Sequence, residues 1–191
     1  MYLSIYKIDR TNTEMARILL DAGEIHQLLL QGFQKSRKEC GLLYMIQDQL
    51  MYIKSDVKPP VKFLYMEQLC VAETIPVQSG KEYGFVTEVL PRHSEHGHKR
   101  PYKGDNAREL RLAWVKRRME QNGVTVLSVF EKEKKEKRFC HTDERGGSAS
   151  ITSFVYTGRI RIDNTENFLA LCSKGLGEGK NYGNGMILLA A

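Results

Sequence analysis

The order of hydrophobic and polar residues predicts a mixed α and β protein. In the first part of the chain, segments that alternate apolar and polar residues indicate strands, and segments with apolar residues every three or four positions indicate helices. The strands are expected at 2–8, 42–46, 50–53 and 82–90, and the helices at 14–20 and 22–33. This part therefore has the predicted order β-α-β-β-(α)-β.

The second part follows a polar, basic stretch that carries proline and histidine. Its helices are expected at 106–122 and 164–173, and its strands at 124–129, 151–156, 159–162 and 186–190. Both parts then share the split β-α-β order of a ferredoxin-like unit. The expected fold is α+β, with two tandem ferredoxin-like (RRM-like) βαββαβ domains. Their bounds are 1–91 for the N-terminal domain, 92–105 for a basic connector, and 106–191 for a C-terminal domain with a basic hairpin and a Gly-rich loop.

Positive charge dominates the chain, with 29 Lys and Arg against 23 Asp and Glu and a net charge of +6. This charge gathers in three stretches, which favours an anionic polymer such as nucleic acid as partner. The stretches are Lys35, Arg37 and Lys38; Arg92, Lys99, Arg100 and Lys103; and Lys132, Lys134, Lys135, Lys137 and Arg138. If the two domains pack side by side, the stretches could form one continuous track.

Cysteine usage and hydropathy indicate the compartment. The four cysteines lie far apart and form no C-x-x-C pair, so neither a disulfide framework nor a zinc finger is supported. No stretch approaches the roughly 18 apolar residues of a membrane span, and the N-terminus lacks the layout of a signal peptide. We expect a soluble, cytoplasmic protein that does not associate with membranes.

A glycine-rich basic loop precedes the last predicted strand. Missing Cβ atoms let backbone N–H groups approach a phosphate chain closely. The spacing fits neither a P-loop, which needs Gly where Lys174 stands, nor a Rossmann fingerprint, which meets Lys180 at its third Gly. A polynucleotide is therefore favoured over a nucleotide. The loop glycines are Gly175, Gly177, Gly179, Gly183 and Gly185.

His26 is the main candidate for chemistry, at the border of the apolar stripe of the predicted helix 22–33. An imidazole can serve as acid or base near neutral pH without a metal. A half-buried histidine that only packs its ring is the competing interpretation. His93, His96 and His98 have H-x-x-H-x-H spacing, but no carboxylate or cysteine group accompanies them.

No cluster of Asp and Glu stands out that could hold catalytic Mg²⁺. A metal-free ribonuclease remains open, because RNA carries its own nucleophile, the 2′-hydroxyl. We therefore expect neither a metal nor a cofactor.

Several motifs resemble the CasE family, the CRISPR RNA processing endoribonucleases of type I-E systems. They are the opening Met1-Tyr-Leu-Ser4, the helix Glu24-Ile-His26-Gln-Leu28, Ala113-Trp114-x-x-Arg117-Arg118, Tyr156-Thr-Gly158-Arg159-Ile-Arg-Ile162, and the terminal Gly175-Leu-Gly177-x-Gly179-Lys180-x-Tyr182-Gly183-x-Gly185-Met-Ile-Leu-Leu-Ala190. The terminal motif is the most specific.

The resemblance implies two ferredoxin-like domains in tandem and a repeat-specific ribonuclease. His26 matches the histidine that works in metal-independent cleavage at the base of the repeat hairpin, with a 2′,3′-cyclic phosphate and a 5′-hydroxyl as products. The expected partners are the CRISPR repeat RNA stem-loop and the other subunits of the type I-E Cascade complex. We expect the protein to keep its RNA product and to be a monomer when free.

Two positions depart from the family pattern. Relatives usually carry Tyr three residues before the histidine, where this chain has Gly23, and an Arg/Asn-rich strand end is replaced by Glu88-Val-Leu-Pro91. Arg145, Lys174, Lys180 or Tyr182 could supply the missing charge or hydroxyl, and the sequence does not choose among them. Two alternatives stay open: a subunit that binds the repeat hairpin without cutting it, and a structural protein in which the basic track is incidental.

Overall fold

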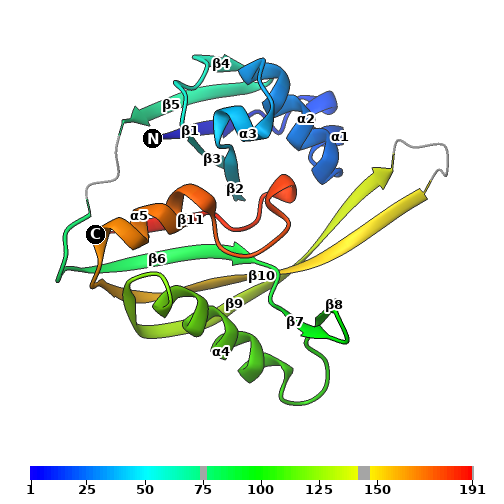
Figure 1. The fold of residues 1–191 in the computed structure, drawn as a ribbon. Helices are drawn as coiled ribbons and strands as arrows, with labels where there is room; N and C mark the ends of the chain where they lie inside the picture. Colours follow the sequence, from blue (N-terminus) through cyan, green and yellow to red (C-terminus); the bar gives the residue numbers. More distant parts are fainter. Residues whose placement is uncertain (74–76, 142–146, 191) are drawn as a thin grey trace. The chain divides into compact units, whose positions relative to one another are not determined.

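The computed structural model describes residues 1–73, 77–141 and 147–190, which belong to two compact units (Figure 1). The first unit comprises residues 1–75, 136–152 and 180–183. The second unit comprises residues 76–135, 153–179 and 184–191. Two short segments of the C-terminal part thus belong to the first unit. Within the described residues, no helix has the length and apolar character that a membrane crossing requires.

The first unit is a five-stranded antiparallel sheet with the order β2-β3-β1-β5-β4. Its strands are β1 (Tyr2–Ile8), β2 (Leu43–Gln47), β3 (Leu50–Ser55), β4 (Lys62–Phe63) and β5 (Met66–Ala72), and its helices are α1 (Thr13–Ile18), α2 (Ala22–Phe33) and α3 (Arg37–Cys40). The predicted strands 42–46 and 50–53 are confirmed as β2 and β3, which pair as a hairpin from Leu43 opposite Lys54 to Gln47 opposite Leu50. The short helix α3 was not predicted.

Helix α2 buries the stripe that its sequence pattern predicted. Ile25, Leu28, Leu29 and Phe33 join one core cluster with residues of β1, β2 and β3. Burying such a side chain stabilises the fold by roughly 1.5–3 kcal/mol. The helix begins after the N-cap Asp21 and ends at Gln34, whose left-handed conformation stops it. His26 therefore occupies the second turn of a helix whose rotation is set by its buried face.

The second unit contains a sheet with the order β11-β6-β10-β9. Its elements are β6 (Glu82–Val89), β7 (Arg92–Glu95), β8 (His98–Pro101), α4 (Ala107–Glu120), β9 (Val124–His141), β10 (Gly147–Ile162), α5 (Thr165–Lys174) and β11 (Ile187–Ala190). The parts of β9 and β10 that lie within residues 136–152 belong to the first unit. In chain order β6, α4, β9, β10, α5 and β11 form a βαββαβ unit with its first and third strands at the centre. The predicted α+β class and ferredoxin-like order are confirmed.

The predicted strand 82–90 was assigned to the wrong part of the chain. Strand β6 pairs with β10 on one side and β11 on the other, so it is the central first strand of the second unit. Without it, residues 106–191 would supply only three strands of the βαββαβ order, and the strand near the sheet centre would be missing.

The expected connector at 92–105 is in large part a regular hairpin, formed by β7 and β8. His96 and Gly97 lie at its turn with φ values of 48° and 79°. Two consecutive left-handed residues are typical of the type I′ turn that joins adjacent antiparallel strands. The His-Gly pair carried this turn signal in the sequence.

The charged run at 131–139 is part of the long strand β9. Side chains alternate along it: Lys132, Lys134 and Arg138 are exposed, whereas Lys135 and Lys137 are half-buried. The strand period of two therefore divides the predicted basic hairpin into an outward-facing set and an inward-facing set.

Candidate active site

His26 lies in α2 with its Nε2 atom shielded from solvent, and the described residues offer this atom no hydrogen-bond partner. Burial lowers the pKa of the imidazole, and the positive charge of Arg37 lowers it further. The ring is consequently neutral at neutral pH. A neutral imidazole with an uncommitted nitrogen can accept a proton from a bound hydroxyl.

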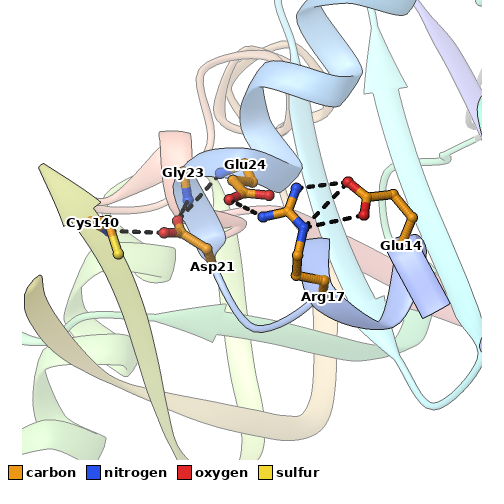
Figure 2. A network of polar contacts seen from close by, with 6 residues as sticks. All are labelled: Glu14, Arg17, Asp21, Gly23, Glu24 and Cys140. Carbon is orange, nitrogen blue, oxygen red and sulfur yellow. Dashed lines mark hydrogen bonds and ion pairs between the residues drawn. The ribbon is translucent and has the colours of Figure 1, made fainter. Parts of the chain in front are cut away.

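One carboxylate joins the start of α2 to the end of β9. Asp21 Oδ1 accepts hydrogen bonds from the backbone N–H groups of Gly23 (2.7 Å) and Glu24 (3.3 Å), and Oδ2 accepts one from the Cys140 N–H (2.9 Å) (Figure 2). Burial opposes the charged form of Asp21, but the hydrogen bonds from Cys140 and Gly23 outweigh it and lower the pKa of this carboxyl. The helix carrying His26 is therefore anchored to a strand more than a hundred residues away in the chain.

Arg17 lies between Glu14 and Glu24 (Figure 2). Its guanidinium nitrogens are 2.7 Å from Glu14 Oε1 and 2.6 Å from Glu24 Oε1. All three side chains are exposed. Exposed pairs of this kind contribute little to stability, because water screens the two charges. We assign them to the helix surface and not to the site.

The space beside Gly23 is bordered by an aromatic pair. A Cβ atom at position 23 would lie 3.0 Å from Asp21 Oδ1 and 3.9 Å from Phe139 Cβ. The ring of Phe139 is stacked on Tyr182, with centroids 4.5 Å apart and planes 14° from parallel. Position 23 thus faces the end of β9, and Phe139 in turn covers one face of Tyr182.

The short helix η1 (Lys180–Tyr182) packs against α2 and β2. The hydroxyl of Tyr44 donates to the carbonyl of Asn181 at 3.0 Å, and the Lys137 ammonium donates to the carbonyls of Tyr182 (2.6 Å) and Gly183 (3.3 Å). Together with the Phe139–Tyr182 stack, these contacts attach η1 to both β2 and β9. The position of η1 in the first unit is therefore fixed by contacts at Asn181 and at Tyr182.

The charge of Arg37 acts on both His26 and Lys180. Lys180 is half-buried, and burial together with the charge of Arg37 lowers the pKa of its ammonium. Arg37 begins α3, which a capping box between Ser36 and Glu39 stabilises, and its Nε atom is buried without a hydrogen-bond partner in the described part of the chain. One guanidinium thus acts on a histidine from α2 and a lysine from η1. Such an arrangement attracts an anion such as a phosphate.

The four auxiliary candidates have different positions. Lys180 and Tyr182 belong to the first unit with His26, whereas Lys174 is exposed at the end of α5 in the second unit. Arg145 lies outside the described residues. The structure thus brings two of the four into the unit of His26.

The predicted basic stretches are only partly available to a ligand. Lys35 and Lys38 are exposed around α3, and Lys99, Arg100 and Lys103 are exposed in and after the β7–β8 hairpin, although Arg100 pairs with Glu95 at 2.9 Å. Arg92 is half-buried.

In β9, two of the predicted RNA-binding lysines are engaged within the protein. Lys135 lies 3.8 Å from the buried carboxylate of Glu88 and 3.7 Å from Glu133, and Lys137 holds η1. Glu88 also accepts a hydrogen bond from Ser153. Glu88, which stands where the resembled family has an Arg/Asn-rich strand end, is therefore a buried partner of Lys135 in β9.

Three of the five loop glycines already use their N–H groups within the protein. Gly175 donates to Leu171, Gly183 to Lys180 and Gly185 to Glu88. These three N–H groups are therefore engaged within the protein in this structure. Phosphate contact by the loop glycines stays a prediction.

Gly183 is required by packing. Its φ is +74°, and a Cβ atom there would lie 2.8 Å from Cε2 of Tyr44, a side chain only 2% exposed. The same Tyr44 bonds η1. Sequence reasoning missed Tyr44, Asp21 and Phe139; of these only Asp21 carried a local signal, as an acidic residue just before a helical pattern.

The H-x-x-H-x-H spacing does not gather its histidines. His93 packs its ring near Tyr102, with centroids 4.9 Å apart, while His96 and His98 are exposed. Across residues 1–73, 77–141 and 147–190, no group of three or more His, Cys, Asp or Glu side chains could hold a metal ion.

Comparisons with known proteins show the family of this chain. A family model described as CRISPR associated protein matches residues 1–191. No curated protein sequence matches the chain.

Solved structures share the fold at low identity. The CRISPR endoribonuclease Cse3 bound to 19 nt RNA is 19% identical with a TM-score of 0.87, and each chain is covered completely. The CRISPR-associated protein Cas6e from Escherichia coli str. K-12 is 18% identical with a TM-score of 0.74, covering 100% of this chain and 99% of the other. A chain of a CRISPR RNA-guided surveillance complex is 18% identical with a TM-score of 0.71 and the same coverage. The resemblance that the motifs indicated is confirmed, and the chain belongs to the family of CRISPR-associated proteins.

Proposed function

We propose that this protein is a metal-independent, hairpin-specific endoribonuclease that cleaves precursor CRISPR RNA repeats and keeps the mature RNA. The observation that carries the proposal is the shielded Nε2 of His26, which has no hydrogen-bond partner among the described residues, in a chain that matches a CRISPR-associated family over its whole length. The Cse3 structure that shares this fold holds an RNA of 19 nt.

The chemistry follows from the neutral histidine. His26 takes the proton of a 2′-hydroxyl, whose oxygen attacks the adjacent phosphorus and displaces the 5′-oxygen of the next nucleotide. The products are a 2′,3′-cyclic phosphate and a 5′-hydroxyl. Arg37 and Lys180 place positive charge where the phosphorane carries negative charge, and such electrostatic stabilisation is a large contribution to catalysis.

The exposed lysines and arginines supply the binding surface. Lys132, Lys134 and Arg138 project from the solvent side of β9. A double-stranded RNA stem presents phosphates across a deep, narrow major groove that side chains cannot read, so these residues grip its backbone. Retention of the product would make the protein a subunit of a type I-E Cascade complex, in line with the surveillance-complex chain of the same fold.

The test incubates the purified protein with its own repeat RNA in EDTA, beside an RNA with 2′-deoxyribose at the scissile nucleotide. We expect a single cut in the first RNA and none in the second. His26→Ala should abolish useful cleavage, since general acid–base catalysis is worth about 10²–10⁴-fold, while leaving hairpin affinity largely unchanged. Cleavage of the deoxy RNA, or a comparable loss of affinity in the variant, contradicts the proposal.

A second candidate function is a hairpin-binding subunit that does not cleave. Gly23 favours it, because position 23 lacks the tyrosine that the resembled family usually carries there. Tight binding of the repeat hairpin without a cut in either RNA would establish this alternative.

A further inference from the structure

The proposed reaction moves a second proton besides the one that His26 takes. When the 2′-oxygen attacks phosphorus, the departing 5′-oxygen needs a proton to leave as a hydroxyl. His26 holds the proton it has just taken and cannot supply a second one. A separate proton donor is therefore needed.

The structure removes most of the candidates for this donor. Arg37 stays protonated in proteins and cannot deliver a proton near neutral pH. The ammonium of Lys137 is bonded to two carbonyls, and the hydroxyl of Tyr44 is bonded to Asn181. Tyr182 is stacked on Phe139 with its carbonyl held by Lys137, so its contacts already serve to hold η1.

Lys180 differs from all of these. It begins η1, which packs against α2, and its side chain is half-buried. No hydrogen bond or ion pair engages its ammonium in the portion of the chain that the structure describes. The guanidinium of Arg37 acts on Lys180 and on His26 alike, which places both in the field of one charge.

We infer that Lys180 is the general acid that protonates the 5′-oxygen while His26 acts as the base, an inference that rests on the proposed ribonuclease function. The proton of the 2′-hydroxyl moves to His26, the O2′–P bond forms, the P–O5′ bond breaks, and a Lys180 proton moves to O5′. The cycle leaves an imidazolium and a neutral amine. His26 then loses its proton to water, and Lys180 regains one from water.

The environment of Lys180 suits this role. The pKa of the Lys180 ammonium is lowered mainly by burial and to a smaller extent by the charge of Arg37. Lys180 is therefore a stronger acid than a free lysine. The contacts from Tyr44, Lys137 and Phe139 hold η1 in place, so the donor needs little rearrangement. Phe139 and Tyr182 are thus positioning residues for Lys180.

A modified substrate separates proton donation from charge stabilisation. Replacing the bridging 5′-oxygen by sulfur gives a thiolate leaving group that departs without a proton, because a thiol has a pKa near 8.5. We expect Lys180→Met to slow cleavage of the ordinary RNA by about 10²–10⁴-fold and to cleave the 5′-thio RNA at nearly the wild-type rate. His26→Ala should slow both RNAs.

Two further variants complete the experiment. Lys180→Arg keeps the positive charge but cannot donate a proton, so it should be slow on the ordinary RNA and normal on the 5′-thio RNA. Lys62→Met removes an exposed lysine of β4 in the same unit and should leave both rates unchanged. Repeat-hairpin affinity, measured for each variant, shows whether the fold is intact.

The outcomes separate this inference from the proposed function. If the wild-type protein cleaves neither RNA, the proposed function fails. If the wild type cleaves but Lys180→Met or Lys180→Arg retains the wild-type rate on the ordinary RNA, Lys180 is not the acid. Equal slowing of the ordinary and 5′-thio RNAs by Lys180→Met also overturns the assignment. Should Lys180→Met lose hairpin affinity, the same comparison is read from Lys180→Arg.

Discussion

Replacing Gly183 by alanine tests whether η1 is held as the structure describes. Gly183 follows η1 and has a φ of +74°, and the new Cβ atom would lie 2.8 Å from Cε2 of Tyr44. The Tyr44 ring is 2% exposed and belongs to the core of the first unit, so it cannot swing into solvent. The substitution therefore combines a backbone cost with a packing cost.

The two costs can be estimated separately. A left-handed conformation costs an L-residue about 1–2 kcal/mol. Forcing an extra carbon into a packed core costs typically about 1–3 kcal/mol. The expected total is about 2–5 kcal/mol, which is a large part of the roughly 5–15 kcal/mol stability of a typical domain. The protein can avoid part of it by releasing η1 from its contacts with α2 and β2.

Gly80→Ala is the matched control. Gly80 has a φ of +80° and donates its N–H to Ile162 at 2.7 Å, but a Cβ atom there meets nothing within 4 Å. It should carry the backbone cost alone, about 1–2 kcal/mol. Urea denaturation of both variants gives the difference in the free energy of unfolding, and cleavage of repeat RNA reports release of η1. If Gly183→Ala is as stable as Gly80→Ala and cleaves normally, the Tyr44 contact does not constrain the loop.

Three further predictions concern the site and its binding surface. Arg37→Gln removes a charge that disfavours the imidazolium, so the pKa of His26 should rise and the acid limb of the kcat/KM profile should move to higher pH. Replacing Lys132 and Lys134 by alanine should flatten the salt dependence of hairpin affinity, because each phosphate contact releases counterions. Asp21→Ala removes the N-cap of α2 and should lower the free energy of unfolding by about 0.5–2 kcal/mol in urea denaturation.

Each of these predictions has a control. If the acid limb of the kcat/KM profile of Arg37→Gln stays at the wild-type pH, the guanidinium of Arg37 does not act on His26. For the salt dependence, Lys116→Ala in α4 should leave the slope of affinity against salt concentration at its wild-type value. If the variant with alanine at Lys132 and Lys134 also keeps the wild-type slope, these two lysines of β9 do not contact RNA phosphates. Asp21→Asn keeps an oxygen acceptor for the helix start and should destabilise less than Asp21→Ala.

Local patterns in the sequence determined much of the fold. The apolar stripe at 22–33 predicted α2 with its observed bounds and left His26 at the border of the buried face. The segments 42–46 and 50–53 were predicted as strands, and they correspond to the paired strands β2 and β3. These features depend on neighbours within a few residues, so hydrophobic periodicity and capping are sufficient to identify them.

The tertiary structure decided which distant residues join the unit of His26. Phe139 of β9 and Lys180 of η1 are remote from α2 in the chain but belong to its unit, and strand β6 joins a sheet whose other strands all follow position 120. Lys132 and Lys135 have the same charge in the sequence, yet one is exposed and the other pairs with the buried Glu88. Composition predicts that such charges meet an anion, but only long-range packing fixes which side chains are shielded from water and which remain free to bind it.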